Sequence, residues 1–170
     1  MKAKSISYLI TPILFVIGLL PSCKNIYGEI INDDVLLNKL YSKAADTVLT
    51  SSNKVLIVAS AYRNFMPGGP IPRDTKLVVS VDIVDFDSVT LENRLSYDQL
   101  YVIMGNTIWK SSPYIDNTSY LELFQDRVYS NGGPEWRVGE LINVVLEITD
   151  KHSLNKYYLI SQDVEIQKEV

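Results

Sequence analysis

The sequence is poor in the residue types on which many catalytic and metal sites depend, with one cysteine and one histidine among its 170 residues. A zinc site of the usual kind needs several Cys or His ligands, so this class is excluded. The single cysteine, Cys23, excludes an internal disulfide, and the fold must rely on its hydrophobic core. His152 is predicted to lie in a polar hairpin turn beside Asp150 and Ser153, where a solvated histidine is a simpler interpretation than a catalytic base. We therefore expect a non-catalytic protein without a cofactor.

The chain also lacks an excess of positive charge. It has 16 Lys and Arg against 20 Asp and Glu, a formal net charge of −4, and its basic residues form no patch along the sequence. Because nucleic-acid surfaces need such patches, the sequence excludes a nucleic acid as partner. Calcium is the metal that Asp82, Asp85 and Asp87 suit best, but strand alternation places Asp82 on the opposite face from the other two. We therefore expect no metal site.

An uncharged apolar run follows Lys2 and Lys4 and ends at residues 20–23, Leu-Pro-Ser-Cys. A positive end, an apolar segment and a helix-breaking Pro-Ser step are the parts of a bacterial export signal. Residues 20–23 resemble a lipobox, with an apolar residue three positions before the cysteine and a small residue directly before it. The resemblance implies that a type II signal peptidase removes residues 1–22 and that Cys23 carries three acyl chains, which together give a lasting membrane anchor.

The residue after this cysteine bears on location. Lys24 stands where many inner-membrane lipoproteins have an aspartate, so the resemblance implies the outer membrane. Residues 24–27 lack the acidic cluster that takes some lipoproteins to the cell surface, which favours a periplasm-facing protein. Two alternatives stay open: ordinary secretion, or an uncleaved transmembrane helix over residues 5–23, which is long enough to span a bilayer but is interrupted by Pro12.

Hydrophobic periodicity predicts one helix followed by strands. From Asn32 to Ala45 the apolar residues recur with a helical period, which predicts one short amphipathic helix that docks against the domain or serves as a stalk. After Ala45 the period changes to two. The predicted strands cover residues 47–50, 54–63, 76–86, 99–104, 106–111, 120–129, 140–149 and 156–166. About seven short strands separated by turn signals predict a mainly β protein, an antiparallel immunoglobulin-like β-sandwich.

The C-terminal part is similar to the closing strands of bacterial immunoglobulin-like and fibronectin-like modules. An aromatic-x-x-Gly turn from Trp136 to Gly139 leads into an alternating strand, and a hairpin containing Asp150 returns the last strand. This resemblance bears on fold and not on function. We expect three parts along the chain. They are a signal peptide, 1–22; a lipidated N-terminus with linker and helix, 23–45; and a β-sandwich domain, 46–170.

Two loops rich in Pro and Gly contain the candidate binding residues. Segment 62–72 combines three prolines and two glycines with Arg63, Phe65 and Met66, and the second loop ends at Trp136. Because the loops of a sandwich gather at its two ends, these loops can form one rigid aromatic surface, with Arg63 stacked on Trp136. The alternative is that Phe65, Met66 and Trp136 plug the open end of the sandwich.

Trp109 forms a second aromatic group with Tyr114 and Tyr120, which is typical of surfaces that stack on sugar rings and also of ordinary sheet packing. Two functions therefore remain open. In the first, the domain is a protein-interaction or assembly module that presents its proline-braced loops or a strand edge to an unknown partner. In the second, it is a glycan-binding accessory module that uses Trp109, Trp136 and nearby tyrosines.

Overall fold

The computed structural model describes residues 28–65, 75–91, 94–115 and 123–170; Cys23, Met66 and Tyr120 lie outside these ranges. The described residues form one helix and eleven strands. They are β1 (Glu29–Ile31), α1 (Asp34–Lys43), β2 (Ala44–Ala45), β3 (Thr47–Leu49), β4 (Lys54–Asn64), β5 (Leu77–Asp85), β6 (Leu95–Met104), β7 (Thr107–Ser111), β8 (Tyr114–Ile115), β9 (Gln125–Gly133), β10 (Leu141–Asp150) and β11 (Lys156–Glu169). The mainly β class with one short N-terminal helix is confirmed, and the predicted number of about seven strands is corrected.

Three of the additional strands, β1, β2 and β8, have only two or three residues. Segments of that length show no hydrophobic period, so the sequence pattern misses them. The strand predicted over 120–129 begins at Gln125, and the helix predicted to reach Ala45 ends at Lys43. Among the described residues, no helix combines the length and the apolar character needed to cross a membrane.

The strands of the described residues form one sheet in the order β1-β7-β6-β10-β11-β4-β5-β9-β8, with β2 added beside β11 and β3 beside β4. Strand β11 joins the two halves. Its first part is antiparallel to β10, with Leu159 opposite Leu146, whereas its last four residues are parallel to β4, with Ile166 opposite Ala61. This parallel pairing corrects the expectation of a wholly antiparallel sandwich of separate sheets.

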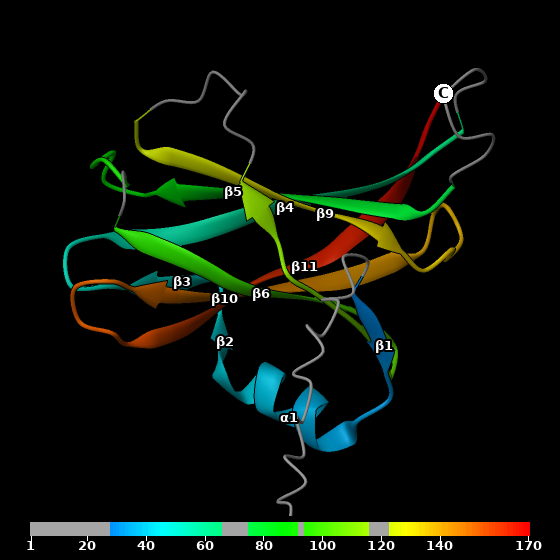
Figure 1. The fold of residues 1–170 in the computed structure, drawn as a ribbon, viewed down its shortest axis with the longest axis horizontal. Helices are drawn as coiled ribbons and strands as arrows, with labels where there is room; N and C mark the ends of the chain where they lie inside the picture. Colours follow the sequence, from blue (N-terminus) through cyan, green and yellow to red (C-terminus); the bar gives the residue numbers. More distant parts are fainter. Residues whose placement is uncertain (1–27, 66–74, 92–93, 116–122) are drawn as a thin grey trace, which may run out of the picture.

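The sheet curls at β11 so that its two halves face each other as layers (Figure 1). We call the half formed by β1, β7, β6, β10, β2 and the first part of β11 the helix-side layer. The half formed by β3, β4, β5, β9, β8 and the end of β11 is the open-side layer. Helix α1 lies below the helix-side layer in Figure 1.

The main core lies between the two layers. In β5 every second residue from Leu77 to Ile83 is fully buried, as the two-residue period predicts. From the other layer, every second residue of β10 from Val144 to Ile148 packs into the same cluster. Each such aliphatic side chain contributes about 1.5–3 kcal/mol through burial, so this cluster is the main source of stability.

A second, smaller core lies under α1. The Asp33 carboxylate begins the helix as its N-cap, accepting the backbone N–H groups of Val35 at 2.9 Å and Leu36 at 3.0 Å. Leu40 is fully buried and packs with side chains of the helix-side layer, among them Tyr101 and Val145. The helix therefore docks against the domain, and the helix-side layer is buried on both faces.

Residues 28–45 belong to the sheet as well as to the helix. Strand β1 pairs with β7 at one edge of the helix-side layer, and β2 pairs with β11, with α1 between them in the chain. The segment expected to be a linker with a helix thus contributes two strands to the fold. It crosses the outer face of the layer that it covers.

Side chains close the curled sheet on the side away from β11. The indole of Trp109, on β7, lies against Gly133 of β9, where an added Cβ would be 2.7 Å from the ring. Gly28 makes a similarly close approach from the N-terminal side, at φ +75°, a conformation that glycine adopts without strain. The Tyr97 hydroxyl of β6 donates to the Asp126 carboxylate of β9, and burial followed by this hydrogen bond raises the pKa of Tyr97. Contacts between distant strands therefore hold the two layers together here.

Candidate functional site

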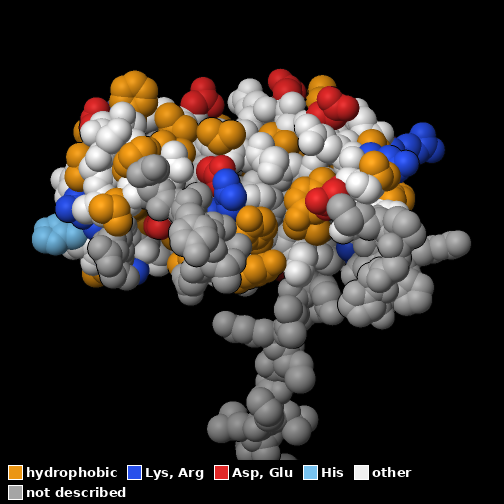
Figure 2. Space-filling model, turned by 90° about the horizontal axis from the view of Figure 1, so that it is seen from above, with side chains coloured by type: hydrophobic (Ala, Val, Ile, Leu, Met, Phe, Trp, Pro, Cys, Tyr) orange, Lys and Arg blue, Asp and Glu red, His pale blue; other side chains and the backbone are white. Residues whose placement is uncertain are grey.

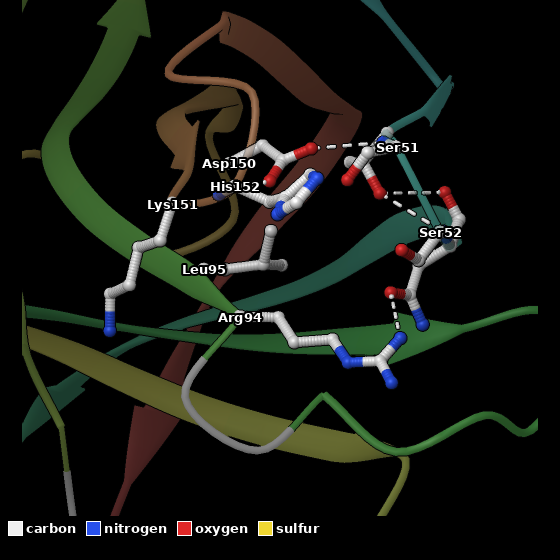
Figure 3. Close-up of a pocket in the computed structure, with 9 residues that line it drawn as sticks. Ser51, Ser52, Arg94, Leu95, Asp150, Lys151 and His152 are labelled. Carbon is white, nitrogen blue, oxygen red and sulfur yellow. Dashed lines mark hydrogen bonds between the residues drawn. The ribbon is translucent and has the colours of Figure 1, made fainter.

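A hollow of about 360 Å³ opens at one end of the two layers. The turn between β3 and β4, residues 50–53, forms one wall, and the start of the turn between β10 and β11, residues 150–152, forms another. Arg94 and Leu95, at the start of β6, complete the lining (Figure 3). This volume is at the lower end of the range for small-molecule sites.

The β3–β4 turn is held by hydrogen bonds between Thr50 and Asn53. The Thr50 backbone N–H donates to the Asn53 carbonyl at 2.8 Å, and the Asn53 N–H donates to the Thr50 hydroxyl oxygen at 3.1 Å. Both residues are buried, whereas Ser51 and Ser52 between them are exposed. The turn is thus a rigid support that presents two serines at its tip.

Asp150 ties the two turns together. Its buried carboxylate accepts the backbone N–H groups of Ser51 and His152, both at 2.9 Å, and of Ser153 at 3.3 Å. The pKa of Asp150 lies well below its usual value, mainly because the Ser51 side chain donates a hydrogen bond to the carboxylate. The backbone N–H groups of Ser51 and His152 lower the pKa further, whereas burial raises it. The carboxylate is therefore ionised and already occupied by donors from the chain.

A chain of hydrogen bonds positions Arg94. The Asp85 carboxylate, which is 1% exposed, accepts the Asn53 side-chain amide at 2.5 Å. The side-chain amide oxygen of Asn53, Oδ1, in turn accepts a hydrogen bond from the Arg94 guanidinium at 3.1 Å. Asp85 also accepts the backbone N–H groups of Asp87 and Val89, both at 2.9 Å. In the described part of the chain, no carboxylate lies within ion-pair distance of Arg94.

The directions of the side chains give the hollow its charge. In Figure 3, Arg94 and His152 extend toward the serine turn, whereas the Lys151 ammonium lies on the other side of Leu95. Lys151 is fixed through its backbone, whose N–H donates to the Arg94 carbonyl at 2.9 Å. The cationic group directed toward the serine turn is thus the Arg94 guanidinium, while the carboxylates of Asp85 and Asp150 are buried and hydrogen-bonded.

The predicted binding residues Arg63, Phe65 and Trp136 are brought together at the opposite end of the layers. The Arg63 guanidinium donates to the Trp136 carbonyl at 2.9 Å and to the Thr75 carbonyl at 2.5 Å. The ring that it faces is Phe65, 5.2 Å from the guanidinium carbon to the ring centroid, which corrects the expected stacking of Arg63 on Trp136. Arg63 therefore braces the loops through their backbone.

The aromatic rings at this end differ in exposure. Trp136 is partly buried and packs against the main core, as the alternative of a plug requires. Phe65 is 38% exposed, with Arg63 on its ring and the Lys168 ammonium 5.7 Å from its centroid. Gly132 and Gly133 were predicted to lie in the second loop, but they form the end of strand β9.

Trp109 is not at the surface. It is 1% exposed and lies between the layers, so its ring offers no face to a sugar. Strand β7 is covered on both faces, with Ile108 toward α1 and Trp109 toward the main core. Its expected partner Tyr114 is 49% exposed and stacks instead on Tyr129 of β9, at 5.9 Å between ring centroids.

The three aspartates weighed for calcium have other partners. Asp82 forms an ion pair with Arg127 on the outer face of the open-side layer, and Asp85 caps the turn that contains Asp87. Across the described ranges, no group of three or more His, Cys, Asp or Glu is placed to hold a metal ion.

Sequence reasoning recognised both turns of the hollow but not the site itself. The missing parts are the bonds from Asn53 to Asp85 and from Arg94 to Asn53, which join residues 32 and 41 positions apart. A local pattern contains no signal for such pairs. The cluster Ser51-Ser52-Asn53 indicated only a turn, and Arg94 belonged to no motif.

Comparisons with family models, with curated proteins and with solved structures find no match for this chain. The chemistry of the site therefore rests on its own residues.

Proposed function

We propose that this chain is a lipid-anchored protein of the cell envelope whose β domain acts by binding, as a protein-interaction or assembly module at the outer membrane, facing the periplasm. The binding role is inferred from the outer face of the open-side layer. Helix α1 packs on the other layer, and this face has exposed apolar side chains at Val58, Phe86 and Tyr114, which are 56%, 60% and 49% exposed. We take this sheet face, which the helix leaves uncovered, as the surface that meets a partner.

The composition of this face suits a reversible contact. Figure 2 looks onto it and shows hydrophobic side chains interspersed with acidic and basic ones. The Asp82–Arg127 ion pair lies on this face, and the Lys54 ammonium lies 4.2 Å from the centroid of the Phe86 ring. Mixed apolar and charged surfaces are typical of non-obligate interfaces.

The short connection to Cys23 supports a role at the membrane surface. Strand β1 begins at Glu29, six residues after the cysteine. Six residues span at most about 20 Å when fully extended. With Cys23 lipidated, the domain is held close to the bilayer and meets partners that are also near it.

The finer assignment of an immunoglobulin-like module is part of the same proposal. Its support is the turn from Trp136 to Gly139, which precedes β10, and the hairpin at Asp150, which leads into β11. The parallel pairing of β11 with β4 and the order of the strands distinguish this domain from a simple seven-stranded sandwich.

Glycan binding is the second candidate function. The burial of Trp109 removes the aromatic residue expected to lead it, but the stacked pair of Tyr114 and Tyr129 on the open-side layer favours it. A half-exposed tyrosine presents both a ring and a hydroxyl to a sugar.

The anchor is tested by expressing the full chain and its Cys23→Ser variant in a bacterial host with a labelled fatty acid. We expect the wild type to partition into membranes, with residues 1–22 removed and three acyl chains in its intact mass, and the variant to carry no label. Ser22→Ala is the matched control, because it keeps a small residue before the cysteine and should be lipidated normally. A wild type without acyl mass at Cys23 would contradict the proposal.

The binding role is tested with a photo-crosslinking amino acid at position 58, in cells that make the protein naturally. We expect one discrete adduct. The control position is 154, where Leu154 is 75% exposed in the β10–β11 turn and should give none. Equal labelling at both positions, or none at position 58, would count against an interaction module that uses the open-side layer.

A further inference from the structure

We infer that the hollow between the β3–β4 and β10–β11 turns binds an anionic sugar, a saccharide ring that bears a carboxylate or a phosphate. This site is separate from the outer face of the open-side layer and does not depend on the lipid anchor. Its basis is the cavity, the charge of its rim and the supply of hydrogen-bond donors that the chain leaves for a ligand.

Arg94 is held in a fixed orientation by its neighbours. The relay from Asp85 through Asn53 fixes one nitrogen of the guanidinium at 3.1 Å from the amide oxygen, and both supporting residues are at most 3% exposed. A guanidinium has five N–H donors in a rigid fork that matches carboxylate and phosphate oxygens. Since no described carboxylate pairs with Arg94, its remaining donors are oriented in advance for an anion from outside.

Most other lysine and arginine side chains of the described residues are already engaged, and the two exceptions, Lys43 and Arg137, do not line the hollow. Arg63, Lys76, Lys110, Arg127 and Lys156 form ion pairs, and Lys39, Lys54 and Lys168 lie over aromatic rings. Arg94 and Lys151 have neither kind of partner among the described residues, and both line the same hollow. The charge of Arg94, which extends toward the serine turn, is therefore left for a ligand of opposite sign, whereas the Lys151 ammonium acts only from the far side of Leu95.

The size and the lining of the hollow suit a sugar ring. A hollow of about 360 Å³ is much larger than a single phosphate or carboxylate. Its lining combines an apolar side chain, Leu95, with the serine turn and the imidazole of His152. A sugar ring has an apolar face and hydroxyl groups at its rim, so it complements such a lining better than a small ion does.

The hydrogen-bond donors of the hollow suit a sugar better than an acidic peptide. Recognition of an extended peptide or its terminal carboxylate commonly uses backbone N–H donors. Here the backbone N–H groups of Ser51, His152 and Ser153 are already taken by Asp150. The donors left for a ligand are side chains at the rim, which suits scattered hydroxyls and one anionic group.

His152 provides the readout, because it is the only histidine in the chain and its imidazole NMR signals are unambiguous. The experiment titrates the full chain, labelled at histidine and held in detergent, with glucuronate and with glucose 6-phosphate. We expect saturable shifts of the His152 signals with at least one of them. The response to glucose, the matched neutral ring, should be at least 10-fold weaker.

Variants of the residues that line the hollow test whether the sugar binds there. Arg94→Gln should weaken binding about 10-fold or more, because it removes a charge-assisted hydrogen bond. Lys151→Gln, whose ammonium points away in Figure 3, should weaken it about 2- to 3-fold. The control is Arg137→Gln, an exposed residue that does not line the hollow. If Arg94→Gln loses its folded spectrum, Arg94→Lys, which keeps the charge, should weaken binding less than 10-fold while remaining folded.

Several results would overturn the inference. They are an absence of saturable shifts, an equal response to glucose, and an unchanged affinity in a folded Arg94→Gln variant. Equal affinity for inorganic phosphate and glucose 6-phosphate would reduce the hollow to an adventitious ion site only. Tighter binding of a short acidic peptide than of either sugar would assign the hollow to a protein ligand instead. Lipidation of Cys23 affects none of these outcomes, so failure here and failure of the anchor can be told apart.

Discussion

The two layers of this protein contain strands of similar length, yet they bury their residues in different patterns. In β10 of the helix-side layer, five consecutive residues from Val144 to Ile148 are buried. In β4 of the open-side layer, burial alternates from Val55 to Ile57 and beyond, with Val58 exposed. The difference arises from α1, which covers the outer face of one layer only. In this chain, the run of five buried residues in β10 marks a strand that is covered on both faces.

The buried run of the helix-side layer includes one charged residue, Glu147. Its carboxylate accepts the Tyr101 hydroxyl at 3.1 Å and the Lys156 ammonium at 2.7 Å. Burial, followed by the charge of Glu147, raises the pKa of Tyr101 above its usual value. A carboxylate on a doubly covered strand is thus tolerated because it has both a hydrogen-bond donor and a cation.

The largest effect is expected where the two layers meet. Trp109→Ala removes a fully buried indole and should cost about 3–5 kcal/mol of unfolding free energy, measured by denaturant unfolding. Trp136→Ala is the control and should cost less, because that ring is only partly buried. A loss below about 0.5 kcal/mol for Trp109→Ala would be typical of a surface residue and would contradict the packing of Trp109 between the two layers.

The next largest loss of stability is expected where α1 packs on the helix-side layer. Leu40→Ala should destabilise the protein by about 2–4 kcal/mol, since Leu40 is the fully buried anchor of α1. Val35→Ala, on the same helix but 80% exposed, should change stability by less than about 0.5 kcal/mol. Equal effects from the two variants would mean that the helix is not docked as described.

A smaller effect, dependent on pH, is expected at Asp150. Its pKa is lowered in the folded protein, so its ionised form adds stability above the unfolded-state value of about 4, and this stability is lost as the pH falls below it. Asp150→Asn should cost about 1–3 kcal/mol at neutral pH, because buried N–H groups lose a charged acceptor. Denaturant unfolding of both proteins from pH 7 to pH 2 should show the difference shrinking below pH 4. If the difference in unfolding free energy between the two proteins did not change with pH, the charge of Asp150 would not be the source of the stability.

The smallest effect is expected on the uncovered face. Val58→Ala should change the unfolding free energy by less than about 0.5 kcal/mol, because Val58 is 56% exposed and points away from the main core. The check is denaturant unfolding at two protein concentrations. A loss above about 1.5 kcal/mol, or a dependence on concentration, would show that this face is covered in solution, and the contrast between the layers would then be wrong.

The sequence predicts local structure well in this chain and long-range structure poorly. The two-residue period identified the buried positions of β5, and the capping aspartates marked the start of α1 to within a residue or two. The period does not name the partner of a strand, so the parallel pairing of β11 with β4 and the resulting curl were not foreseen. For Trp109 the sequence left a sugar-stacking surface and ordinary sheet packing both open, because the residues that cover it, Gly28 and Gly133, are remote in sequence.

The hollow, too, could be predicted from the sequence only in its local parts. Its turns follow from local residue types, but the orientation of Arg94 depends on Asn53 and Asp85, which folding brings together from three separate segments. In contrast, the proximity of Arg63, Phe65 and Trp136 could be anticipated, because loops at one end of a layered β fold meet.

The packing of Trp109 between the two layers of the curled sheet is tested most directly by the fluorescence of this one tryptophan. The chain has two tryptophans, so Trp136→Phe leaves Trp109 as the only one. We predict a blue-shifted emission maximum and little quenching by acrylamide in the native variant, because Trp109 is 1% exposed. Both properties should change to those of a solvated indole on unfolding. A red-shifted, readily quenched emission in the native state would place Trp109 at the surface and contradict the packing of its ring between the two layers.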